Sequence, residues 1–288
     1  MRHLYECPMR WADMDLLGHI NNVVYVDYLQ EARVDMLRTH GPAAARTGQL
    51  AEGTVVVRHE VTYAAPLHFG YRPVSIECWV TQVRAASFTV AYEVFHEDPD
   101  GLRQVYLRAK TVLTPYVFTT EQPRRITDEE REMLGLFLEP EDVVRPAPFP
   151  RERPAATLHY PVHVRFSDVD VYGHVNNVKY FEYFQEARIS GIAQLWEGLD
   201  QAALVVAQTD VDYRVPILFR PEPYDAWSWV ARVGQRSATI ESVICDGDTT
   251  LARARVTIVF FDQETQRSTV PPEVYLDRLR TLELTRTS

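Results

Sequence analysis

The sequence is short of cysteine and of long apolar runs, and each shortage excludes a class of protein. Its three cysteines, Cys7, Cys78 and Cys245, lie far apart and are odd in number. We therefore expect free thiols in a reducing compartment rather than a disulfide framework. No segment of about 18 apolar residues is present, and no apolar signal region follows Met1. We expect a cytoplasmic protein that does not bind a membrane.

Positive charge is also scarce, because the net charge is −10 and the pI is near 5.4. This balance argues against a nucleic-acid-binding protein, which works through a positive field. The net negative charge does not exclude an anionic small ligand, which needs only a local basic patch. We find no metal-ligand spacing and no glycine-rich phosphate loop, so neither a metal nor a cofactor is predicted. His159 and His163 are four residues apart but fall on a predicted strand, where they do not form a zinc pair.

What the sequence does contain is one polar stretch that occurs twice. Residues 10–33 match residues 165–188 without gaps at fourteen of twenty-four positions. The apolar positions differ, whereas the acidic, histidine and asparagine positions agree. A repeated core would show the opposite pattern, so we interpret the stretch as a repeated site. Its shared polar and glycine residues include Asp13, Asp15, Gly18, His19, Asn21 and Asn22 in the first copy, and Asp168, Asp170, Gly173, His174, Asn176 and Asn177 in the second.

The repeat extends over whole domains. In the first half, alternating and valine-rich patterns predict a strand, a buried helix and four more strands, over residues 4–11, 21–41, 54–63, 73–84, 87–95 and 103–117. Thr127 to Glu130 has capping-box spacing and predicts a short helix. The second half repeats this order. Its strand, helix and four further strands are predicted over residues 159–166, 176–196, 203–213 and 224–233, in a segment that begins at 237, and over 251–261. A C-terminal helix follows. We predict an N-terminal domain at 1–138, a proline-rich linker at 139–156 and a C-terminal domain at 157–288.

Within each copy the polar residues fall on a turn between strand and helix. Gly18 is the residue expected to take a positive φ at this turn. Asn21 and Asn176 are the predicted N-caps of the two long helices.

The sequence Asp-x-Asp-x-x-Gly-His-x-Asn-Asn-x-x-Tyr, placed between a strand and a long buried helix, resembles the motif of the hot-dog-fold thioesterases. These are the 4-hydroxybenzoyl-CoA thioesterase-like enzymes and the plant acyl-ACP thioesterases; the second copy is especially similar to the latter. The resemblance implies an α+β chain of two tandem hot-dog domains, each an antiparallel sheet wrapped around a central helix. It further implies edge-to-edge pairing of the sheets and active sites between the halves.

The resemblance also implies an activity: hydrolysis of an acyl-CoA, or alternatively an acyl-ACP, to free acid and thiol. Hydrolysis needs an attacking oxygen, a group that activates it and a donor for the developing charge on the carbonyl oxygen. In the resembling enzymes the second acid of Asp-x-Asp is nucleophile or general base, which is Asp15 and Asp170 here. His19 and His174 would orient that carboxylate or the water. The amides of the helix start, around Asn21–Asn22 and Asn176–Asn177, would stabilise the oxyanion.

The chain departs from the acyl-ACP pattern at one position. Leu17 and Tyr172 stand where those enzymes carry an asparagine two residues before the histidine. An Asp-centred, water-assisted mechanism is therefore the favoured one, and the two sites are expected to be unequal.

Each residue also has a structural alternative. Asp13 and Asp168 are expected to bind turn or helix-start amides, and Asp15 and Asp170 could do the same. His19 and His174 could be held partners of the loop. Glu31 with Arg33, and Glu186 with Arg188, are interpreted as interdomain ion pairs.

Ligand contacts are predicted more loosely. Gly18, Asn21, Asn22, Gly173, Asn176 and Asn177 are candidate substrate contacts, and Arg84 and Arg236 are candidate contacts for CoA phosphates. Two rival functions remain: a hydratase on the same fold and a non-catalytic acyl-thioester binder. The retention of both acids and of Gly-His in each copy counts against the binder. Acyl chain length, carrier and oligomeric state stay open, with a homodimer of double hot dogs as one expectation.

Overall fold

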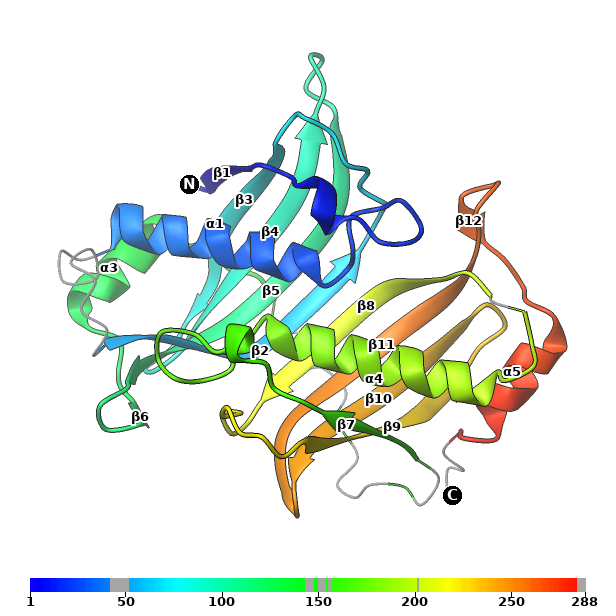
Figure 1. The fold of residues 1–288 in the computed structure, drawn as a ribbon. Helices are drawn as coiled ribbons and strands as arrows, with labels where there is room; N and C mark the ends of the chain where they lie inside the picture. Colours follow the sequence, from blue (N-terminus) through cyan, green and yellow to red (C-terminus); the bar gives the residue numbers. More distant parts are fainter. Residues whose placement is uncertain (42–51, 143–147, 150–153, 155–156, 201, 284–288) are drawn as a thin grey trace. The chain divides into compact units, whose positions relative to one another are not determined.

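The computed structural model describes residues 1–41, 52–142, 148–149, 154, 157–200 and 202–283. By its contacts the chain divides into two compact units, Met1–Val143 and Val144–Ser288. Each unit is an antiparallel sheet with one long helix lying across a face of it (Figure 1). This confirms the predicted α+β hot-dog class; the exact domain limits and the linker bounds stay a prediction.

The first unit is ordered β1-β3-β4-β5-β2, with β6 pairing to β5. Its elements are β1 (His3–Cys7), a 3-10 turn η1 (Trp11–Asp13), α1 (Val24–His40), β2 (Glu52–Tyr63), β3 (Val74–Val83), β4 (Phe88–Glu97), β5 (Arg103–Val117), β6 (Gln122–Pro123) and α3 (Asp128–Leu136). The expected strand over 4–11 is shorter than predicted. It ends at Cys7 because Pro8 has no amide for the ladder and the chain then turns into η1.

The second unit repeats this architecture in the order β7-β9-β10-β11-β8, with β12 pairing to β11. Its elements are β7 (Leu158–Val162), η2 (Phe166–Asp168), α4 (Lys179–Leu195), β8 (Leu204–Tyr213), β9 (Tyr224–Val233), β10 (Ser237–Asp246), β11 (Thr249–Asp262), β12 (Arg267–Ser268) and α5 (Glu273–Arg280).

The long helices are buried along one side, which fixes the position of the turn that precedes them. In α1, Tyr25, Leu29, Ala32 and Met36 recur at helical spacing and are 0–3% exposed. The helix packs against β1 and β3. Because β1 leads into η1 and α1 follows the turn, the polar stretch is held between a strand and a buried helix.

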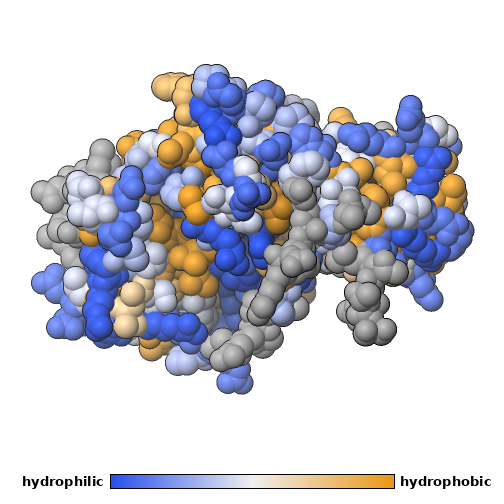
Figure 2. Space-filling model, turned by 90° about the horizontal axis from the view of Figure 1, so that it is seen from below, coloured by the Kyte–Doolittle hydropathy of each residue, from blue (hydrophilic) through white to orange (hydrophobic). Residues whose placement is uncertain are grey.

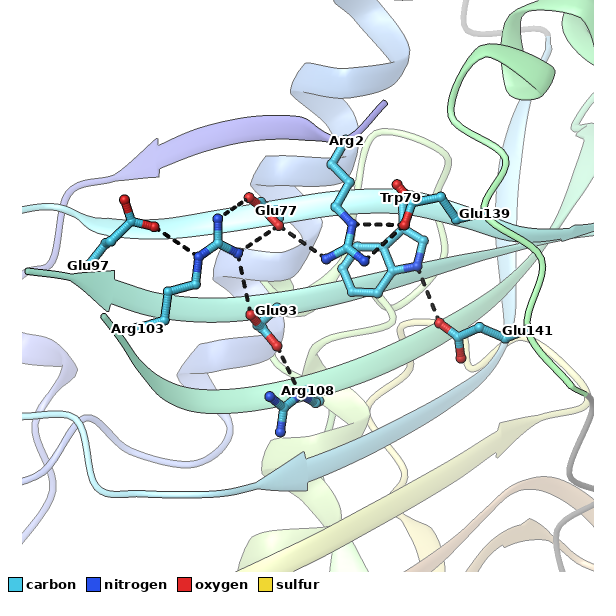
Figure 3. Close-up of polar contacts among 9 residues, drawn as sticks. All are labelled: Arg2, Glu77, Trp79, Glu93, Glu97, Arg103, Arg108, Glu139 and Glu141. Atoms are coloured by element: carbon cyan, nitrogen blue, oxygen red, sulfur yellow. Dashed lines mark hydrogen bonds and ion pairs between the residues drawn. The ribbon is translucent and has the colours of Figure 1, made fainter. Parts of the chain in front are cut away.

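The sheet face away from α1 carries charge instead of a second core. Figure 3 shows Arg103 in ion pairs with Glu77, Glu93 and Glu97, and Arg2 lying over the Trp79 ring. The guanidinium carbon of Arg2 is 3.8 Å from the ring centroid. Surface ion pairs of this kind contribute little singly but keep a sheet face solvated.

Hydrophobic side chains also reach the surface among hydrophilic ones, as Figure 2 shows for one face. Among the described helices, none has the length and apolar character needed to cross a bilayer. All three cysteines are buried, and none of them forms a disulfide in the structure.

Candidate functional site

The polar stretch forms a tight turn that closes on itself through backbone hydrogen bonds. The Asp15 amide donates to the His19 carbonyl at 2.8 Å, and the Gly18 amide donates to the Asp15 carbonyl at 3.0 Å. Gly18 has φ +77, as predicted, a value that residues with a side chain rarely adopt. The second copy has the same bonds at 2.8 and 3.1 Å, made by Asp170, Gly173 and His174.

The first acid of each copy is an anchor for the turn. Asp13 is 3% exposed and accepts hydrogen bonds from the Arg10 amide, the Arg10 guanidinium and the Tyr28 hydroxyl. Burial opposes the charged form, but these donors outweigh it and hold the pKa of Asp13 below its ordinary value. Asp168 has the equivalent donors, Arg165 and Tyr183, and its pKa is lowered for the same reasons. The expected structural role is therefore present, although arginine and tyrosine supply most of the donors.

The second acid of each copy has a different environment. Asp15 is half-buried, and its Oδ1 accepts the Leu17 amide at 2.9 Å. In the part of the chain that the structure describes, its other oxygen has no hydrogen-bond donor. Asp170 is likewise half-buried and accepts the Tyr172 amide at 2.9 Å. One carboxylate oxygen thus orients the group while the other remains available to a water or a substrate.

The predicted helix N-cap is wrong in both copies. Helix α1 begins at Val24, and its N-cap residue is Val23, without a side-chain cap. The Asn21 side chain instead accepts the Val23 amide at 3.2 Å in a turn that precedes the helix. Asn176 makes the same bond to the Val178 amide at 3.3 Å, ahead of α4.

The hydrogen bonds of this turn show which backbone amides are already used and which could donate to an oxyanion. The Asn21 amide is used, because it donates to the Asp13 carbonyl at 2.8 Å, as Asn176 does to Asp168. The Asn22 amide makes no hydrogen bond within the described residues, so it is available as a donor. The Asn22 carbonyl accepts the Tyr63 hydroxyl at 2.8 Å, which fixes its orientation. Tyr213 holds the Asn177 carbonyl in the same way at 2.8 Å.

The histidines of the two copies differ in their surroundings. His19 is 8% exposed, and its ring packs edge-to-face on His68 at 4.8 Å between centroids. Burial, and to a smaller extent His68, lower the pKa of His19, while Asp15 opposes the shift. His174 is half-buried, and its backbone pairs with Leu218.

A tyrosine adds to this difference. Tyr172 occupies the Leu17 position, and its pKa is raised by burial and by Asp170. The predicted inequality of the two sites thus has a visible basis in their side chains.

Two sets of predicted residues lie elsewhere. Arg84 and Arg236 lie just beyond the C-terminal ends of β3 and β9. The N-terminal ends of these strands pair with the strand that precedes the turn in each half, roughly 30 Å away along the strand. Arg33 is 5% exposed and donates to the Tyr92 hydroxyl of its own unit at 3.3 Å, and its pairing across the two domains stays a prediction. Arg188, its counterpart, is also buried at 7% exposure.

Sequence reasoning missed two features of the site. The hydroxyls of Tyr28 and Tyr183 hold Asp13 and Asp168, and the recurrence of the two tyrosines at the same position of both copies was the available signal. His68 has no counterpart, since Leu218 takes its place, so no repeat could mark it. Among the residues described, no cluster of histidine, cysteine or acidic side chains could hold a metal.

Known proteins resemble this chain in sequence. The family model of the Thioesterase-like superfamily matches residues 9–155 and 164–279. The long-chain acyl-CoA thioesterase FadM of Escherichia coli (strain K12) is 30% identical over 114 residues, which cover 37% of this chain and 85% of FadM.

Solved structures resemble the chain over almost its whole length. The 12:0-ACP thioesterase from Umbellularia californica has a TM-score of 0.71 at 17% identity, covering 90% of this chain and 93% of that one. A candidate oleoyl thioesterase from Lactobacillus plantarum has a TM-score of 0.74 at 16% identity, covering 91% and 97%. At these identities the likeness shows the fold alone.

Proposed function

The chain belongs to the thioesterase-like superfamily and is an acyl-thioester hydrolase, and we propose that Asp15 and Asp170 are its catalytic carboxylates. The observation that carries this assignment is that the two acids of Asp-x-Asp differ in burial and in hydrogen bonding. The first acid is buried and fully bonded, whereas the second is half-buried with one oxygen available. The second acid alone can therefore approach a substrate.

In the proposed mechanism, the available oxygen of Asp15 accepts a proton from a water that attacks the thioester carbonyl. Attack forms the C–O bond and places negative charge on the carbonyl oxygen, and collapse of this intermediate expels the thiolate, which takes up a proton. His19 orients the water, and the Asn22 amide donates to the oxyanion. One well-placed donor of this kind is worth roughly 3 kcal/mol of barrier. In the second copy, Asp170 and its neighbours take the same roles.

We propose acyl-CoA as the carrier form, because the similar FadM protein is a long-chain acyl-CoA thioesterase. Acyl-ACP is the alternative. Arg84 and Arg236 as phosphate contacts, and Gly18, Gly173, Asn176 and Asn177 as substrate contacts, remain proposals. The three free cysteines fit a reaction in the cytoplasm.

The test is thiol release from a panel of acyl-CoAs of increasing chain length. We expect Asp15→Asn and Asp170→Asn each to remove part of the activity, and the double variant to lower turnover by at least about a hundredfold, the scale of a lost general base. Asp98→Asn is the matched control, since Asp98 also accepts turn amides, from Asp100 and Leu102, but lies on the β4–β5 turn. Full activity of the double variant would refute the assignment, and activity on acyl-ACP alone would change the carrier.

A further inference from the structure

We propose that His68 is a positioning residue for His19, and that this contact makes the first site chemically different from the second. The inference rests on the proposed function, since His19 matters only if the turn at Asp15 performs hydrolysis. His68 follows β2 on a separate segment of the first unit and belongs to neither copy of the repeated stretch.

Two contacts join His68 to the turn. Its ring meets the His19 ring edge-to-face, with 4.8 Å between centroids and 76° between planes. Its Nδ1 lies 3.3 Å from the Gly18 carbonyl oxygen. When Nδ1 carries the proton, this is a hydrogen bond to the residue directly before His19. A third bond, from the Ile20 amide to the Leu67 carbonyl at 2.8 Å, aligns the two segments.

Together these contacts restrain His19 through both of its chain neighbours, Gly18 and Ile20, and through its ring. His19 is 8% exposed, whereas His68 lies at the surface. Among the described residues, His68 and Asp15 are titratable groups whose charge acts on His19. Burial, and to a smaller extent His68, lower the pKa of His19 and so disfavour its charged form, which leaves His19 a nitrogen able to accept a hydrogen bond from water.

The second half supplies an internal comparison. Its equivalent backbone bond, from the Val175 amide to the Ile217 carbonyl at 2.9 Å, is intact. The residue after Ile217 is Leu218, which offers His174 no aromatic ring and no titratable group. The backbone bond between the two segments is thus the same in both halves, whereas the residue next to it is histidine in the first half and leucine in the second.

The experiment isolates the first site with the Asp170→Asn background and then replaces His68 by leucine, the residue that the second half carries. We expect kcat to fall about tenfold with KM unchanged, because a misplaced catalytic group slows the chemical step without removing a substrate contact. We also expect the acid limb of the kcat–pH profile to move to higher pH. Loss of the His68 contribution raises the pKa of His19, and a higher pH is then needed to keep it neutral.

Two further variants make the test decisive. His68→Asn, which retains a donor for the Gly18 carbonyl, should recover part of kcat but keep the altered pH profile. In a His19→Ala background, His68→Leu should cause no additional loss, because the two residues act through one contact. An equal loss in that background, a change in KM alone, or no change at all would overturn the proposal. If Asp15→Asn leaves first-site activity intact, the proposed function itself fails, a result distinct from a silent His68→Leu.

Discussion

At the residue scale, two aspartates of one turn are separated by their hydrogen-bond donors. Asp13 accepts from a guanidinium, a hydroxyl and an amide, so its charge is satisfied inside the protein. Asp15 accepts from one amide and keeps an oxygen for other partners. The printed sequence marks both acids equally, since both recur in the second copy. Only the three-dimensional positions of Arg10 and Tyr28 distinguish the anchoring acid from the acid that we propose to be catalytic.

The anchoring acids should make the protein sensitive to acid. Their folded-state pKa lies below the ordinary value of 3.8. The stability that they contribute is therefore present above pH 3.8 and is lost as the pH falls through the folded-state pKa. Asp13→Asn should lower the free energy of unfolding at pH 7 by about 2 kcal/mol, the scale of a hydrogen bond to a charged group. Its stability should then fall less steeply with acid than that of the wild type.

Urea denaturation at a series of pH values measures both effects. Asp15→Asn is the matched control in the same turn. It should change the free energy of unfolding by less than about 0.5 kcal/mol, because the Asp15 side chain has no buried hydrogen-bond partner among the described residues. An equal loss in the two variants would show that both acids are anchors.

At the element scale, the ends of helices were predicted with mixed success, and the reason is local. The capping box of α3 is confirmed: the Thr127 hydroxyl accepts the Glu130 amide at 3.2 Å, and Glu130 accepts the Thr127 amide at 2.9 Å. Asn21 failed as an N-cap because its side chain bonds an amide two residues on, which closes a turn before α1 begins. Asparagine suits both motifs, so composition alone does not choose between them.

The capping box should stabilise the first unit measurably. Helix α3 buries Met133 and Leu134, and the Phe137 carbonyl after it accepts the Val80 amide of β3 at 2.9 Å. Fraying at Thr127 therefore weakens packing on the sheet as well as the helix. We expect Thr127→Ala to cost about 1 kcal/mol of unfolding free energy. The control is Thr120→Ala, an exposed threonine whose hydroxyl reaches only the Val117 carbonyl at 3.4 Å. Equal midpoints of denaturation for the two variants would contradict the prediction.

At the scale of the whole molecule, the tandem fold was predictable because both halves share the same polar residues and the same order of strands and helices. Turns, alternation and the buried helix each constrain local structure, and their recurrence over both halves defines two similar units. Pairing of the two sheets stays a prediction, since it depends on edge strands that no motif marks. His68 shows the same limit at the site, because a contact made once leaves no pattern in the sequence.

The overall charge gives a last prediction, about how substrate arrives. A net charge of −10 repels acyl-CoA, whose phosphates are anionic, and salt screens this repulsion over about 10 Å at 0.1 M. We expect kcat/KM for an acyl-CoA to rise with ionic strength between low and physiological salt. The matched substrate is the N-acetylcysteamine thioester of the same acid, which lacks phosphates and should give a flat profile. A fall for acyl-CoA alone would mean that local arginine contacts with the phosphates outweigh the global field. Repeating the measurement with Arg84→Gln and Arg236→Gln would then show whether these two arginines make those contacts.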